Sequence, residues 1–134
     1  MSSSVSVCMA TYNGREWVLE QLRSILDELE EGDEIVVVDD ASTDDTADLV
    51  AALDDPRIRL HRSTVNRGYV RTFEDAMSRA RGDVVFLSDQ DDEWIPGRRA
   101  VLVDALARGS VAASNSVLLG SDAPLRSPIT GRPW

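Results

Sequence analysis

The chain has a single cysteine, a single histidine and no lysine. Cys8 has no partner for a disulfide, which indicates a reducing compartment, and its place inside an apolar run predicts core packing. His61 alone excludes most zinc sites and any catalysis that needs two histidines, so we expect it simply to lie on a strand face. Disulfide-rich scaffolds and most zinc-dependent classes are therefore excluded.

Long apolar runs and an excess of basic residues are also missing. No run approaches the roughly 18 residues of a membrane span, and the start MSSSVSV lacks the basic region of a signal peptide. With 14 basic against 24 acidic residues the net charge is −10, which argues against nucleic-acid partners. We expect a cytoplasmic protein. Its 134 residues, 43% of them apolar, suffice for one globular domain with a real core.

Apolar periodicity alternates between strand and helix along the chain. Apolar runs predict strands at residues 5–11, 34–40, 57–62, 83–88 and 110–119, the third of them near a sheet edge. Helical spacing predicts four helices between them. The expected buried positions are Val18, Leu22, Ile25, Leu26 and Leu29 in the first helix, Val70, Phe73, Ala76, Met77 and Ala80 in the third, and Val101, Leu102, Ala105 and Leu106 in the fourth.

Punctuating residues predict where these helices begin and end. Ser42 or Thr43 is expected to cap the N-terminus of the second helix, which Asp54, Asp55 and Pro56 stop. Gly82 is expected to cap the C-terminus of the third helix. Pro96 suits the first turn of the fourth, and Gly109 ends it.

This alternation predicts an α/β domain, a mostly parallel sheet with helices on both faces, because each parallel pair needs a crossover. Ligands of such sheets bind beyond the carboxyl ends of the strands. The residues that follow the first, second and fourth strands should therefore meet at one edge. They are Thr11, Tyr12 and Asn13, then Asp39 and Asp40, and finally Asp89, Gln90, Asp91 and Asp92.

Glycine-rich phosphate loops are absent from this edge. The first strand is followed by TYNGREW, which matches neither the dinucleotide nor the Walker pattern. If the domain binds a diphosphate, another group must neutralise its charge. The carboxylates of FLSDQDDEW are crowded enough to repel one another, and a Mg²⁺ or Mn²⁺ ion held by Asp89 or Asp91 would relieve that repulsion. The alternative is that these residues only form a polar loop between a strand and a helix, without a metal.

Asp39 and Asp40 have two interpretations each. A carboxylate after a buried strand can accept hydrogen bonds from a ribose hydroxyl or from a base N–H, so it can read a nucleoside. Asp40 could instead only shape the turn and cap the next helix. Tyr12 either stacks on the base or only packs.

Four segments together resemble a known family. VSVCMATYNG, IVVVDDASTDDT, NRGYVRTFEDAMSRARGD and VVFLSDQDDEW, in this order and at these separations, are similar to glycosyltransferase family 2, an inverting group with the GT-A fold. Within it, TFED and SDQDDEW resemble the bacterial enzymes that add rhamnose and related sugars to surface polysaccharides. The resemblance covers roughly residues 4 to 119.

The resemblance implies a role for each strand end. Asp39 would recognise the base of a nucleotide-diphosphate sugar, and Asp89-Gln90-Asp91 would be the DXD motif of the family. Asp91 would be the metal ligand, with Asp89 nearer the ribose or sugar. The nucleoside pocket would be lined by Ala10, Thr11, Tyr12 and Asn13, with Asp40 beside it, and Arg71 would reach a phosphate. The implied reaction is an in-line displacement by an acceptor hydroxyl at the anomeric carbon.

The end of the chain departs from the family. Family members continue beyond the fifth strand with the catalytic base and the acceptor-binding loops, whereas this chain ends in GSDAPLRSPITGRPW. We therefore expect a donor-binding domain at residues 1–119, an irregular tail at 120–134, and little sugar transfer by this chain alone. Expected partners are the nucleotide sugar and a saccharide acceptor, with peripheral membrane association of the full-length protein. An exposed face of the unfinished sheet favours a homodimer.

Other classes compete with this interpretation. A nucleotidyltransferase would have a glycine-rich basic loop where this chain has only Gly14 and Arg15. A phosphoacceptor receiver domain would have a lysine after the fifth strand, and this chain contains no lysine. A module that binds nucleotide sugar without catalysis, or a remnant that binds nothing, remains open.

Overall fold

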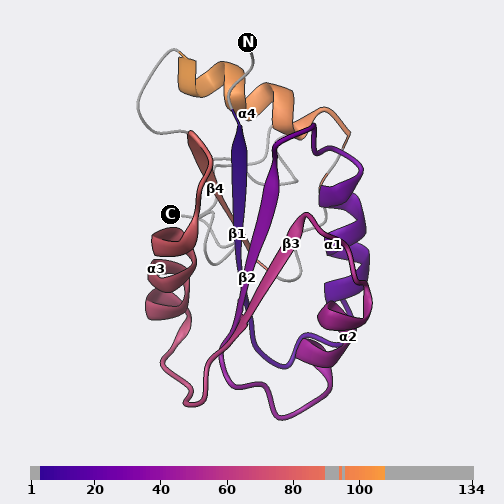
Figure 1. The fold of residues 1–134 in the computed structure, drawn as a ribbon, viewed down its shortest axis with the longest axis vertical. Helices are drawn as coiled ribbons and strands as arrows, with labels where there is room; N and C mark the ends of the chain where they lie inside the picture. The colour runs from indigo at the N-terminus through magenta and orange to yellow at the C-terminus, as the bar shows by residue number, and fades with distance from the viewer. Residues whose placement is uncertain (1–3, 90–93, 95, 108–134) are drawn as a thin grey trace, which may run out of the picture.

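The computed structural model describes residues 4–89, 94 and 96–107 (Figure 1). Strands and helices alternate along the chain, as the apolar periodicity predicts. The elements are β1 (Val5–Thr11), α1 (Val18–Leu26), β2 (Glu34–Asp39), α2 (Thr46–Ala52), β3 (Ile58–Arg62), α3 (Tyr69–Arg79), β4 (Val84–Asp89) and α4 (Arg98–Ala107). The predicted fifth strand at 110–119 and tail at 120–134 lie outside the described residues.

The four strands form one parallel sheet in the order β3-β2-β1-β4. The prediction of an α/β fold is therefore confirmed. β1 is buried along its whole length, which explains its uninterrupted apolar run. β3 alternates apolar and polar residues because it lies at the edge of the sheet, as predicted.

Helices cover both faces of the sheet (Figure 1). Val5, Val7 and Met9 of β1 belong to the larger core cluster, which includes side chains of α1 and α2. Cys8 points to the other face, where it packs with Ala76 of α3. Burial, and secondarily the charge of Glu34, raises the pKa of the Cys8 thiol to about 12 although Arg59 opposes the shift. Core packing of Cys8 is therefore confirmed.

Helix α4 lies across the amino ends of the strands (Figure 1), where a buried ion pair fixes it. Arg99 Nε donates to Asp33 Oδ2 over 2.7 Å, and Arg99 Nη1 donates to Glu30 Oε2 over 3.0 Å. Asp33 also accepts from the backbone N–H groups of Val5 and Glu30, each over 2.8 Å. Its carboxylate therefore joins α4, β1 and the turn before β2.

Two predicted helix caps are wrong. The N-cap of α2 is Asp45 rather than Ser42 or Thr43, because the hydroxyls of those two residues bond to Asp39 and Asn13 instead. Helix α3 ends at Arg79 with Ala80 in an extended conformation, so Gly82 is not its cap. Gly82 instead lies against β1, where its N–H donates to Ser6 Oγ over 2.7 Å.

The predicted apolar faces are only partly buried. Phe73 and Ala76 of α3 are buried as expected, but Val70 and Met77 are exposed, because the buried face of the helix runs through Thr72, Phe73 and Ala76. In α4, Leu102 is buried and Val101 is exposed. Helix α4 begins two residues after Pro96, which lies in the preceding turn. In the part of the chain that the structure describes, no helix has the length and apolar character of a membrane span.

Gly82 is expected to tolerate no side chain. A Cβ there would lie 2.8 Å from Ser6 N and 2.9 Å from Val5 C, both backbone atoms of the central strand. Gly82→Ala should therefore lower the free energy of unfolding by about 1 to 3 kcal/mol, as overpacking does elsewhere. Urea unfolding measures the change, with Arg81→Ala as the neighbouring exposed control, expected to shift stability by no more than about 0.5 kcal/mol. Equal stability of the two variants would contradict the close approach.

Candidate functional site at the carboxyl ends of the strands

The structure places the predicted strand ends together. Thr11 of β1 pairs in register with Asp39 of β2, and Ala10 pairs with Asp89 of β4. Asp39 and Asp89 therefore flank the end of the central strand from its two neighbours. Ala10 and Thr11 are buried between them and form the floor of this edge.

Asp39 is almost fully buried and holds three donors. Its Oδ1 accepts from Thr11 Oγ1 over 2.7 Å and from Ser42 Oγ over 2.6 Å, and its Oδ2 accepts from Ser42 N over 2.9 Å. A carboxylate offers about four acceptor positions. Oδ2 therefore keeps capacity for one more donor, which is what recognition of a ligand N–H or O–H requires.

Asp40 faces a different loop. Its Oδ1 accepts from Arg67 N over 2.7 Å and its Oδ2 from Gly68 N over 3.0 Å, so the carboxylate fixes the turn that begins α3. Gly68 has φ of +88°, a left-handed conformation that favours glycine. The alternative in which Asp40 shapes a turn thus has a clear structural basis, although the helix concerned is α3 rather than the next one, α2.

Asn13 ties the loop after β1 to the loop after β2. Its Oδ1 accepts from the backbone N–H of Thr43 over 2.8 Å, and its own N–H donates to Ser42 Oγ over 2.9 Å. Asn13 and Ala41 both have positive φ, 48° and 60°. Backbone strain of this kind persists only where surrounding contacts enforce it, and it concentrates at functional sites. Tyr12, between these contacts, is 45% exposed at the rim of the edge.

Asp44 adds a fixed negative charge to the second loop. Burial raises its pKa, but hydrogen bonds from the hydroxyl and N–H of Thr46 and the nearby Arg15 outweigh that effect, so the pKa lies below its usual value. Asp39, Ala41, Ser42 and Asp44 share a cavity of about 120 Å³ with residues of α2 and the end of β3. The loop is therefore anionic and concave beside Asp39.

Arg71 lies on the first turn of α3, in an open cleft of about 690 Å³. The cleft is lined by Arg67, Gly68, Tyr69, Val70, Arg71 and Glu74. Sequence reasoning singled out Arg71 but missed Arg67 and Tyr69, although the segment NRGY carried both. Two guanidinium groups in one cleft are suited to bind phosphate oxygens.

β4 ends at Asp89, and the predicted metal motif begins there. The side chain of Asp89, and Gln90 and Asp91 entirely, lie outside the described residues, so their roles stay predictions. Within residues 4–89, 94 and 96–107, no three His, Cys, Asp or Glu side chains gather as a metal site would require. Just before this motif, Gln21 Nε2 of α1 donates to Ser88 Oγ over 2.6 Å in the core. Sequence reasoning missed this buried polar pair, which anchors the end of β4.

Comparison with known proteins decides the family. The family model described as Glycosyl transferase family 2 matches residues 6–126. The chain belongs to glycosyl transferase family 2. The succinoglycan biosynthesis protein ExoO of Rhizobium meliloti, a curated relative of this member of the family, is 35% identical over 84% of this chain and 33% of its own length.

Solved structures agree with the GT-A fold expected for glycosyl transferase family 2. The mannosyltransferase PcManGT from Pyrobaculum calidifontis, in complex with GDP-Man and Mn²⁺, has a TM-score of 0.76 and 31% identity over 85% of this chain and 35% of its own. S. aureus TarS 1-349, in complex with UDP-GlcNAc, has a TM-score of 0.69 and 25% identity over 78% of this chain and 31% of its own. The chain spans less than half the length of the curated relatives it matches.

Proposed function

We propose that this chain is the donor-binding part of an inverting glycosyltransferase and that it binds a nucleotide-diphosphate sugar at the carboxyl ends of β1, β2 and β4. The observation that carries the proposal is Asp39, a buried carboxylate that Thr11 and Ser42 orient and that retains one acceptor position. Membership in the family and relatives bound to UDP-GlcNAc and GDP-Man support it.

Each end of the nucleotide has a candidate partner in this proposal. Asp39 accepts a hydrogen bond from the base or ribose, and the exposed ring of Tyr12 stacks on the base. Asn13 holds the two loops around this pocket through its bonds to Ser42 and Thr43. The phosphates extend toward the arginine-lined cleft at the start of α3, where Arg71 lies.

We propose that Asp91, with Asp89, would hold a divalent cation. The donor set fits Mg²⁺ or Mn²⁺, because both prefer carboxylate oxygen and commonly join one or two carboxylates to substrate phosphates. A bound cation would stabilise the negative charge that grows on the departing diphosphate. A relative in complex with Mn²⁺ and GDP-Man supports this assignment.

The chemistry is a single displacement that inverts the anomeric carbon. A saccharide hydroxyl attacks that carbon as the nucleoside diphosphate leaves from the opposite face, and a carboxylate accepts the hydroxyl proton. No described side chain is assigned to that base or to the acceptor contacts. In this proposal the side chains described here bind and orient the donor.

Metal-dependent nucleotide binding tests the proposal. We expect Mn²⁺ to tighten the binding of UDP or GDP to this chain by about tenfold or more, because the ion offsets repulsion between diphosphate and carboxylates. Asp91→Asn should remove that enhancement, whereas Asp27→Asn, a substitution of an exposed aspartate at the end of α1, should retain it. Calorimetry with and without Mn²⁺ measures both. Absence of nucleotide binding under either condition would refute the donor-binding role.

A further inference from the structure

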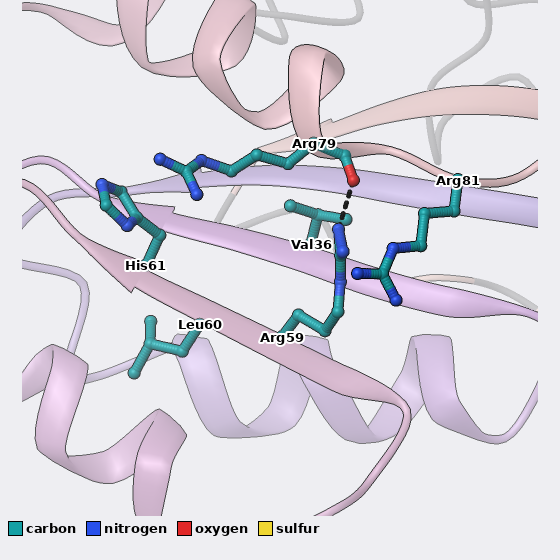
Figure 2. A pocket seen from close by; sticks show the side chains of 6 residues that line it. All are labelled: Val36, Arg59, Leu60, His61, Arg79 and Arg81. Atoms are coloured by element: carbon teal, nitrogen blue, oxygen red, sulfur yellow. Dashed lines mark hydrogen bonds between the residues drawn. The ribbon is translucent and has the colours of Figure 1, made fainter.

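A second cavity lies on the α3 face of the sheet, between the edge strand β3 and the end of α3 (Figure 2). Its volume is about 420 Å³. The lining comprises four basic and two apolar residues: Arg59, His61, Arg79, Arg81, Val36 and Leu60. Such a concentration of positive charge is unexpected in a chain whose net charge is −10.

The cavity is separate from the proposed donor site. Val36 pairs in register with Arg59, three positions before Asp39 along β2, which corresponds to roughly 10 Å of extended strand. Val36 also belongs to the core cluster on the α3 face. None of the cavity's lining residues lines the small cavity beside Asp39 or the cleft at the start of α3.

Two carboxylates only partly balance this charge. Glu34 Oε1 lies 3.1 Å from Arg59 Nε, and Asp75 Oδ1 lies 2.8 Å from Arg79 Nε. The other oxygen of this carboxylate, Asp75 Oδ2, lies 3.9 Å from His61 Nε2. The side chain of Arg81 forms no ion pair with any residue that the structure describes. Two of the three guanidinium groups are therefore paired with carboxylates, and the third, that of Arg81, is not paired with any described residue.

Backbone contacts hold the basic residues around the cavity. Arg59 Nη2 donates to the carbonyl oxygen of Arg79, as the dashed line in Figure 2 marks. Glu34 Oε2 accepts from Arg81 N over 2.7 Å, so one carboxylate binds both the Arg59 side chain and the Arg81 backbone. The fold thus fixes the Arg59 side chain and the backbone of Arg79 and Arg81 beside one another at the cavity.

Protection of a sheet edge explains only part of this arrangement. Charged side chains on an edge strand prevent pairing with other chains, which accounts for Arg59 and His61 on β3. Arg79 and Arg81 come from the end of α3 and the segment after it, where no strand edge needs protection. Their position around a concave surface points to a ligand.

We propose that this cavity binds a phosphate-bearing anion, independently of the nucleotide sugar. The planar guanidinium group matches phosphate oxygens with paired hydrogen bonds, and Arg81 has these donors unused by an ion pair. A volume of about 420 Å³ lies within the range of small-molecule sites and accommodates a phosphate monoester or diphosphate group. The bound anion neutralises the positive charge of the arginines that Glu34 and Asp75 do not balance.

Pyrophosphate titration followed by ¹⁵N NMR tests the site. We expect saturable shifts of the Arg59, Arg79 and Arg81 resonances that chloride at equal ionic strength does not cause. Arg81→Gln should weaken binding about tenfold, the loss expected for one charge-assisted contact. Arg23→Gln removes the same charge from an exposed position on α1 and should leave binding unchanged.

Binding to vesicles distinguishes two sources of the phosphate group, a lipid headgroup and a soluble ligand. Co-sedimentation with phosphatidylglycerol vesicles but not with phosphatidylcholine vesicles, lost in Arg81→Gln and kept in Arg23→Gln, would support the site and assign it to a lipid headgroup. Pyrophosphate binding without vesicle binding would support it and assign it to a soluble ligand. Binding of neither, or equal weakening by both substitutions, would overturn the proposal. Mn²⁺-dependent UDP binding, measured on the same variants, reports separately on the donor site.

Discussion

Asp39→Asn is expected to weaken the binding of UDP or GDP in the presence of Mn²⁺ by more than tenfold. The substitution removes the charge of a carboxylate that is only 3% exposed and replaces one acceptor oxygen with a donor NH₂. An NH₂ in place of Oδ2 would face the N–H of Ser42 and take away the acceptor of the ligand, whereas an NH₂ in place of Oδ1 would disturb the bonds to Thr11 and Ser42 that anchor the loop after β2. A hydrogen bond to a charged group contributes about 1.5 to 3 kcal/mol, which corresponds to tenfold or more in affinity.

The measurement is calorimetry on folded protein, with circular dichroism to verify that the variant retains its fold. Asp27→Asn has the same change of charge at an exposed position and should bind as the unsubstituted chain does. If Asp39→Asn and Asp27→Asn bind nucleotide equally well, Asp39 does not contact the donor.

The largest expected loss of stability follows Asp33→Asn. The substitution removes the buried counter-charge of Arg99, a residue only 6% exposed, and leaves the pair with the exposed Glu30. Breaking one side of a buried ion pair costs about 3 to 5 kcal/mol, a large share of the roughly 5 to 15 kcal/mol that stabilises a typical domain. Urea unfolding should show this loss, while Asp27→Asn should stay within about 0.5 kcal/mol.

The double variant Asp33→Asn with Arg99→Met separates the lost pair from a damaged backbone. Because it removes both charges, it should be more stable than Asp33→Asn alone. If the double variant is no more stable, the cost arises from the backbone contacts of Asp33 with Val5 and Glu30 rather than from the loss of its charge beside Arg99.

Low pH should also lower the stability of the protein through the carboxylate of Asp33. Burial alone would raise the pKa of Asp33, but hydrogen bonds from Arg99 and from the N–H groups of Glu30 and Val5 outweigh it, and the pKa is lowered. A depressed pKa contributes stability that is present above the unfolded-state value of about 3.9 and is lost as pH falls through the lower folded value. Asp33→Asn should therefore lose less stability than the unsubstituted chain between pH 6 and pH 3.

The sequence predicts strands β1 to β4 and their parallel direction. It also predicts the shared edge at which Thr11, Asp39 and Asp89 lie. Apolar runs separated by helical periodicity leave few alternatives to parallel strands with crossovers. Asp39 and Asp89 therefore end their strands at the same edge, as the pattern predicts, whereas Asp91 and Asp92 lie outside the described residues. The roles of these residues follow from the resemblance to the family, not from periodicity, and they stay predictions.

Partners far apart in the sequence could not be predicted. Asp40 binds the backbone 27 and 28 residues further on, and Gln21 meets Ser88 across 67 residues. No local pattern identifies such pairs, because hydrogen bonds between distant loops depend on how the sheet brings them together. The misplaced caps have the same origin. Ser42 is a residue type that often caps helices, but its hydroxyl and N–H both donate to the buried carboxylate of Asp39 instead.

Asp39 and Asp40 are consecutive, yet their carboxylates serve opposite sides of the same strand end. One binds the loop that leads to α2, and the other binds Arg67 and Gly68 at the start of α3. Two adjacent residues of one strand end therefore connect the carboxylate proposed to read the nucleoside to the turn that begins the arginine-lined cleft. A change in either loop would therefore be transmitted to the other through the backbone that Asp39 and Asp40 share.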